Sequence, residues 1–187
     1  SLALGAAPNQ LVADGSSTSE ITVIATDAGG NLVPNQLVTF TTTKGQLAPS
    51  SGRTDSTGKV TVSLTAPTTA GVANVTASAG SASRAVPVTF VVGPPGVLIA
   101  AAGPTTIAAD GRSAATVRAT VTDALGNPIT GQVVTFATTL GAISGSAPTD
   151  ASGVAAVPLT APAVPGVAQV TAQVGGLQAT ATVTFAS

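Results

Sequence analysis

The chain has 187 residues, of which only 7% are charged, and its formal net charge is −1. Charged residues make up about 25% of a typical globular protein. Contacts with nucleic acid or an anionic membrane surface need clustered basic residues, so this composition argues against both partners. The absence of His and Cys excludes Ser–His–Asp and Cys–His catalysis, ordinary zinc sites and disulfides.

The chain contains one β-rich unit twice. The segment at 27–40, DAGGNLVPNQLVTF, returns at 123–136 as DALGNPITGQVVTF. The two copies are 96 positions apart at first and 95 apart from Asp55 and Asp150 onward, so the second copy is one residue shorter in a loop. Units of slightly more than ninety residues match the size of an immunoglobulin-like sandwich.

Short runs of alternating apolar and polar residues predict strands, and no apolar period of 3.6 residues predicts a helix. We expect an all-β chain of two immunoglobulin-like sandwiches, each with seven strands that alternate up and down. The inward residues of the first unit are Ile21, Val23, Ala25, Val38, Phe40, Val60, Val62, Leu64, Ala73, Val75, Ala77, Val86, Val88 and Phe90. Those of the second are Val117, Ala119, Val121, Val134, Phe136, Ala155, Val157, Leu159, Ala168, Val170, Ala172, Ala181, Val183 and Phe185.

The bulkiest inward residues are the four phenylalanines, two in each unit, which we expect to anchor the cores: Phe40, Phe90, Phe136 and Phe185. Pro87 and Pro158 fall on outward positions within strand patterns. Because proline has no N–H to donate to a neighbouring strand, we expect both at sheet edges or bulges.

The boundary between the units lies at 92–96, Val-Gly-Pro-Pro-Gly. It divides the chain into residues 1–92 and 93–187, joined end to end. A Pro-Pro pair favours an extended, semi-rigid connector, so we expect the joint to be stiff.

Six aspartates recur in turn contexts, and they are Asp14, Asp27, Asp55, Asp110, Asp123 and Asp150. One interpretation is that they cap turns by accepting hydrogen bonds from nearby backbone amides. The other is calcium binding, which needs six to eight oxygen ligands, with Asp123 and Asp150 as the candidates. Capping is the preferred interpretation, because no D-x-D-x-D-G string occurs, and we expect neither a metal nor a cofactor.

Alternating strands place alternate loops at opposite ends of a sandwich. The loops at Asp14, Lys44 and Pro67 then share one end of the first unit. The loops at Asp123 and Asp150 share the end where the chain enters the second unit. We therefore predict a contact between Lys44 and one of these two carboxylates that limits bending at the joint.

Several motifs occur in both units: ADG at Ala13 and Ala109, VTF followed by TT-x-G at Val38 and Val134, TD at Thr54 and Thr149, and LTAP at Leu64 and Leu159. As a set they resemble the bacterial immunoglobulin-like (group 1) repeats of the invasin and intimin adhesin family. The resemblance implies an extracellular location at the bacterial cell surface, within a larger secreted or outer-membrane-anchored protein. It also implies that the neighbouring partners are other repeats of the same parent chain.

We expect a non-catalytic spacer that holds a distal domain away from the cell. In each unit the first and last strands should run parallel, so that a pull along the chain shears their hydrogen bonds together. One alternative is an adhesive module that contacts a protein receptor or another copy of itself. Another is a filament subunit that assembles by strand donation, for which the Ala-rich strand at 2–7, alone at the terminus, is the candidate.

Overall fold

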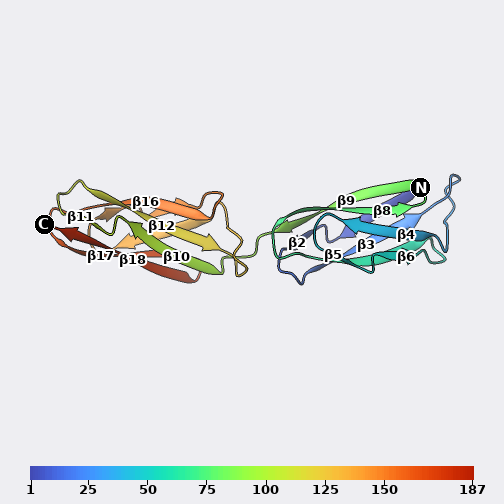
Figure 1. The fold of residues 1–187 in the computed structure, drawn as a ribbon, viewed down its shortest axis with the longest axis horizontal. Coiled ribbons are helices and arrows are strands. Elements are labelled where there is room, and N and C mark those ends of the chain that lie inside the picture. Colours follow the sequence, from blue (N-terminus) through green and yellow to red (C-terminus); the bar gives the residue numbers. More distant parts are fainter. The chain divides into compact units, whose positions relative to one another are not determined.

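The computed structural model describes all 187 residues. The chain divides into two compact units, Ser1–Val92 and Gly93–Ser187 (Figure 1). Each unit consists of strands, turns and loops, and no helix long and apolar enough to cross a bilayer is present. The prediction of an all-β chain of two sandwiches is confirmed.

The first unit contains strands β1–β9 in two sheets. One sheet has the order β1-β3-β7-β5 and the other the order β2-β9-β8-β4-β6. The strands are β1 (Leu2–Ala7), β2 (Gln10–Val12), β3 (Thr18–Ala25), β4 (Leu37–Thr42), β5 (Gln46–Ala48), β6 (Ser51–Arg53), β7 (Lys59–Thr65), β8 (Gly71–Ala79) and β9 (Ala82–Val91).

The second unit repeats this topology with strands β10–β18. Its sheets have the orders β10-β12-β16-β14 and β11-β18-β17-β13-β15. The strands are β10 (Val97–Gly103), β11 (Thr106–Ala108), β12 (Ala114–Thr122), β13 (Val133–Thr138), β14 (Ala142–Ile143), β15 (Ser146–Pro148), β16 (Val154–Thr160), β17 (Gly166–Val174) and β18 (Leu177–Ala186).

The prediction of seven strands per unit was wrong, because two edge strands of each sandwich are split and change sheet. The first strand pairs with β3 as β1, turns at Pro8, and pairs with β9 as β2. The second split strand pairs with β7 as β5 and, after Pro49, with β4 as β6. Proline cannot donate to a ladder, so each of these prolines ends pairing in the first sheet. Residues 2–7 are therefore not alone, since they form a six-residue ladder with β3.

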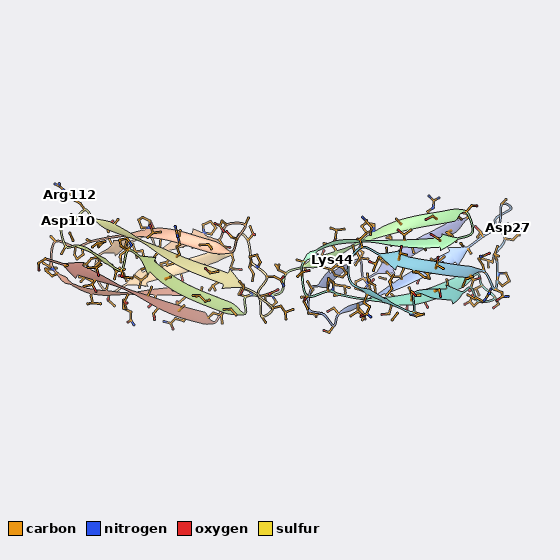
Figure 2. All side chains as sticks on the ribbon, viewed as in Figure 1. Asp27, Lys44, Asp110 and Arg112 are labelled. Atoms are coloured by element: carbon orange, nitrogen blue, oxygen red, sulfur yellow. The ribbon has the colours of Figure 1, made fainter.

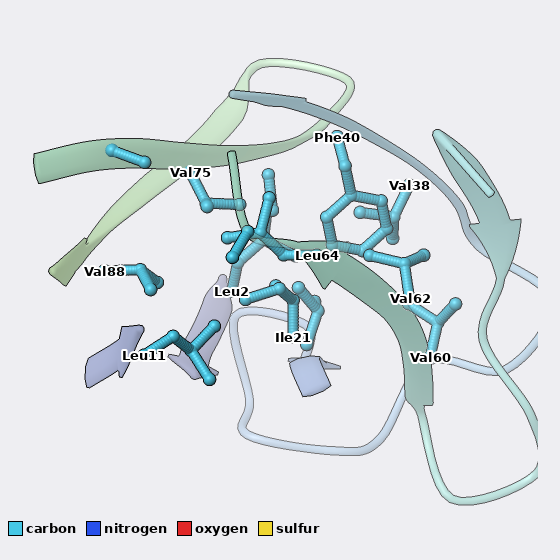
Figure 3. Close-up of a cluster of buried hydrophobic side chains, with 14 of the residues drawn as sticks. Leu2, Leu11, Ile21, Val38, Phe40, Val60, Val62, Leu64, Val75 and Val88 are labelled. Atoms are coloured by element: carbon cyan, nitrogen blue, oxygen red, sulfur yellow. The ribbon is translucent and has the colours of Figure 1, made fainter. Parts of the chain in front are cut away.

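The core of the first unit lies between its two sheets and has contributions from both halves of the split first strand. Leu2 of β1 and Leu11 of β2 are buried in the same cluster as Ile21, Phe40 and Leu64 (Figure 3). All four phenylalanines of the chain are at most 5% exposed. Phe90 and Phe185 are 1% exposed and are the bulkiest fully buried side chains.

Pro87 and Pro158 lie where their strand pairs with a neighbouring strand on one side only, which is an edge position as expected. Thr89 donates its N–H to Asn9 on the β2 side (2.9 Å), and N–H groups two residues apart point the same way. The nitrogen of Pro87 therefore faces the region beyond β2, which pairs only with residues 89–91 of β9. Pro158 likewise lies one residue beyond the last β14–β16 pair, Ile143 with Leu159.

The two copies differ at this proline. In the first unit the equivalent residue, Ser63, pairs with Ala48 at the end of β5. Pro158 has no N–H for such a pair, and β14 has two residues where β5 has three. The residue that the second copy lacks is therefore missing from this split edge strand.

We expect Phe90→Ala to lower the free energy of unfolding of the first unit by about 3–5 kcal/mol, because it leaves a cavity between the two sheets. Calorimetry of the full chain measures this as a lower Tm for one of two transitions. Phe185→Ala is the matched control and should lower the other transition. A loss below about 1 kcal/mol for Phe90→Ala would contradict close packing around this ring.

Candidate functional site: the aspartate loops

Six of the seven acidic residues lie in turns and loops, and they do not converge in a cleft. A surface depression of about 310 Å³ over β3 and β7 is lined by Thr18, Glu20, Thr61, Val62 and Ser63, with Glu20 as its one titratable group. No group of three or more His, Cys, Asp or Glu side chains is placed to hold a metal ion. The six aspartate loops are therefore the candidate sites.

The Asp14 loop follows β2 and forms a compact capped turn. One Asp14 oxygen accepts hydrogen bonds from the N–H groups of Ser16 (2.8 Å) and Ser17 (2.6 Å), and the other accepts the Ser17 hydroxyl (2.6 Å). Asp110 makes the same three contacts, with the N–H groups of Arg112 and Ser113 and the Ser113 hydroxyl. Asp110 and Arg112 lie at the same end of the second unit as the C-terminus (Figures 1 and 2).

The Asp55 and Asp150 loops precede β7 and β16. Asp55 accepts the N–H groups of Thr57 (2.7 Å) and Lys59 (3.0 Å) and the Thr57 hydroxyl (2.6 Å). Asp150 accepts the equivalent groups of Ser152 and Val154. In both turns a single carboxylate oxygen takes all three bonds.

The Asp27 and Asp123 loops connect the second and third long strands of each unit. One oxygen of Asp27 accepts the N–H groups of Gly29 (2.8 Å) and Asn31 (2.9 Å), and the other accepts the Asn31 side-chain amide (3.1 Å). Asp123 makes the equivalent bonds to Leu125 and Asn127. The capping interpretation of these aspartates is confirmed. The carboxylates named as calcium candidates, Asp123 and Asp150, are each occupied by donors of their own loops.

Hydrogen bonding lowers the pKa of all six carboxyl groups below the ordinary value of 3.8. For Asp14 the largest cause is the Ser17 hydroxyl, followed by the Ser17 N–H. For Asp123 burial raises the pKa, but the bonds from Asn127, Gly93 and Leu125 outweigh it. The folded state therefore favours the ionised form of these side chains.

Two buried threonines were missed by the sequence analysis. The Thr54 hydroxyl donates to the Val33 carbonyl (2.7 Å) and accepts the Gln36 N–H (2.9 Å). Thr149 makes the same pair of bonds to Ile129 and Gln132. Both are 4% exposed, so they hold the loop before β4 or β13 against the next turn. The repeated TD pair was the available signal, but only its Asp was interpreted.

Lys44 lies at one end of the first unit and Asp27 at the other end (Figure 2). Its ammonium group donates to the carbonyl of Ala70 and covers Gly71, whose added Cβ would lie 2.7 Å from Nζ. The predicted contact of Lys44 with Asp123 or Asp150 stays a prediction. Of the two carboxylates Asp150 is exposed, whereas Asp123 is 4% exposed and its oxygens accept four hydrogen bonds.

We expect the chain to lose stability in acid through these loops. A folded-state pKa below the unfolded value stabilises the fold above that value, and the effect disappears as the pH falls towards the folded pKa. The Tm should therefore change little between pH 7 and about pH 5 and fall below about pH 4. Thermal unfolding followed by circular dichroism checks this, and Asp55→Asn should flatten the acid limb. An unchanged Tm at pH 2 would contradict the capping account.

Comparisons with known proteins match the two units separately. Residues 1–91 match the family model described as bacterial Ig-like domain (group 1), and residues 98–187 match the one described as invasin, domain 3. These are families of adhesin domains and not of enzymes. A search of curated proteins gave no match.

Solved structures of adhesins are similar to the chain. InvD of Yersinia pseudotuberculosis is 30% identical over 98% of the chain, with a TM-score of 0.68. Invasin, described as a bacterial integrin-binding protein, is 30% identical over 100% of the chain, with a TM-score of 0.56. The chain covers 57% and 39% of those two structures. Their likeness and the two family matches agree on the same repeat, and the chain belongs to the invasin and intimin family of bacterial Ig-like adhesin repeats.

Proposed function

We propose that the chain is a spacer of a bacterial cell-surface adhesin and carries mechanical tension. Two sandwiches in series hold another part of a larger secreted or outer-membrane-anchored protein away from the cell. Their partners are the neighbouring Ig-like repeats of the same parent chain. The family membership supports the extracellular location, and invasin's binding of integrin remains a property of that protein.

The pairing of the terminal strands carries this proposal. In each unit the short strand that follows the first sheet change pairs in parallel with the last strand, β2 with β9 and β11 with β18. In the first unit the Thr89 N–H donates to Asn9 and the Ala13 N–H donates to Val91, both at 2.9 Å. Because the two strands run in the same direction and lead to opposite ends of the chain, tension loads these bonds together in shear.

A spacer has to keep its fold under tension, and the aspartate loops contribute to this. Turn amides that would otherwise require water are bonded to carboxylates two to four residues away. These bonds are local, so their donors and acceptors stay together while the strands are under load. Although the chain has few charged side chains, its six aspartates all stabilise turns.

We expect Thr89→Pro to lower the force at which the first unit unfolds in single-molecule pulling through the termini. Proline removes the N–H that bonds to Asn9 but leaves the side of the strand that faces β8 unchanged. Thr89→Val keeps the N–H and is the matched control, and the second unit is an internal reference in every trace. Equal forces for Thr89→Pro and Thr89→Val would remove the parallel pair as the mechanical element, provided that denaturant titration shows both variants folded.

One observation favours a second function, self-association through a sheet edge. Strand β10 (VLIAAAG) is at the edge of its sheet, contains no charge or proline, and has Val97 and Ile99 41% and 59% exposed. Natural edges are usually protected by charged residues or proline. In the first unit Arg84 donates to the Leu2 carbonyl of β1 at 3.4 Å, whereas Ala179 occupies the equivalent position in the second unit.

If this edge binds a second copy, the mass in sedimentation velocity should rise with concentration, and Ile99→Lys should abolish the rise. Val72→Lys is the control, because Val72 is also exposed (56%) but lies on β8, inside its sheet. A native chain that remains monomeric at high concentration rejects this second function and leaves the spacer.

A further inference from the structure

The Asp27 and Asp123 loops have almost the same internal geometry. Asp27 N–H donates to the Asn31 carbonyl at 2.9 Å, and Asp123 N–H donates to the Asn127 carbonyl at 3.0 Å. In both loops the glycine before the asparagine donates back to the aspartate carbonyl, at 3.3 and 3.2 Å. Any difference in the surroundings of the two carboxylates therefore comes from outside the loops.

The two carboxylates differ in what lies over them. Oδ2 of Asp123 accepts a further hydrogen bond from the N–H of Gly93 (3.1 Å). The Gly96 N–H donates to the Thr122 carbonyl beside it (2.9 Å). Asp123 is 4% exposed, whereas Asp27 is exposed. The segment 93–96 thus lies on the Asp123 loop and covers its carboxylate.

The fit of this segment requires glycine at its last position. A Cβ added to Gly96 would lie 2.6 Å from the backbone nitrogen of Ala124 and 2.9 Å from its Cα. Gly93 and Gly96 are therefore held by two polar contacts and one close backbone approach. Pro94 and Pro95 lie between them, and their rings restrict the segment to an extended conformation.

We propose that the D-x-x-G-N loop of each unit is a docking site for an incoming Gly-Pro-Pro-Gly linker. In the second unit the site is filled by residues 93–96, with Asp123 Oδ2 receiving the first glycine N–H and the Thr122 carbonyl the last. In the first unit Asp27 and Thr26 are the equivalent residues, and the Thr26 carbonyl accepts the Ser1 ammonium group at 2.6 Å. The ligand of this site is the linker of another repeat with the sequence found at 93–96, whose last glycine N–H takes the place of that ammonium group.

Docking has a consequence for the connection between units. Residues 93–96 are fixed to the second unit, so the freedom of the connecting chain is confined to the residues before Gly93. This inference goes beyond the spacer proposal, because it applies equally to a spacer and to an adhesive module. Its readout is a single backbone amide, so it can fail while the pulling experiment succeeds, and the reverse.

The test is Asp123→Asn in the ¹⁵N-labelled full chain, followed by amide hydrogen exchange. Asparagine keeps one acceptor oxygen for the N–H groups of Leu125 and Asn127, but its NH₂ group cannot accept from Gly93. We expect the Gly93 amide to exchange about tenfold faster or more, while the Leu125 and Asn127 amides remain protected. Asp27→Asn is the matched control and should leave Gly93 unchanged. Unchanged exchange of Gly93 in Asp123→Asn would overturn the proposal.

Further variants test the fit of Gly96 and the equivalent loop of the first unit. Gly96→Ala should also release the Gly93 amide, whereas Gly103→Ala should not, because a Cβ there meets nothing within 4 Å. Adding Val-Val-Gly-Pro-Pro-Gly before Ser1 should protect the N–H of the first added glycine. Asp27→Asn in the extended chain should remove that protection. Exchange of the added glycine at the rate of an unstructured peptide would show that the Asp27 loop is not a docking site.

Discussion

The structure depends on the burial of one face of each sheet against the other. With only four phenylalanines and no other aromatic residue, each core is built mainly from Val, Ala, Leu and Ile. Small side chains bury little area each, so the cores need every inward position of both sheets to be filled. This explains why the split first strand contributes Leu2 to one sheet and Leu11 to the other. This strand is therefore an edge strand of both sheets, and it covers one side of the core between them.

Polar satisfaction is the second constraint, and the chain meets it with few charges. A side-chain hydroxyl or carboxylate bonds to the backbone at most sharp turns, and no buried side-chain polar atom lacks a partner. Aspartates take the exposed turns, where an ionised carboxylate can accept several N–H groups. Threonines take the buried positions, Thr54 and Thr149, where an uncompensated charge would be costly. The buried Asp123 is the exception, and its four hydrogen bonds account for it.

The two units differ at equivalent positions of their sheet edges. The first unit has Ser63 where the second has Pro158, and the second has the shorter edge strand. The first unit has Arg84 where the second has Ala179, so the apolar edge of the second unit lacks that side-chain donor. Neither change affects the core, because both lie outside it. The two copies therefore differ at their edges and loops, while their cores are built alike.

The sequence by itself determined the repeat, the positions of the long strands, their inward faces and the turn role of the aspartates. Each of these follows from local chemistry, namely a period of two residues along a strand and short side chains that bond to amides two to four residues away. Only the tertiary structure decided where the edge strands change sheet, why Pro158 shortens β14, and why Asp123 is buried while Asp27 is exposed. These features depend on contacts between residues far apart in the chain, such as Gly93 with Asp123, and no local pattern contains them.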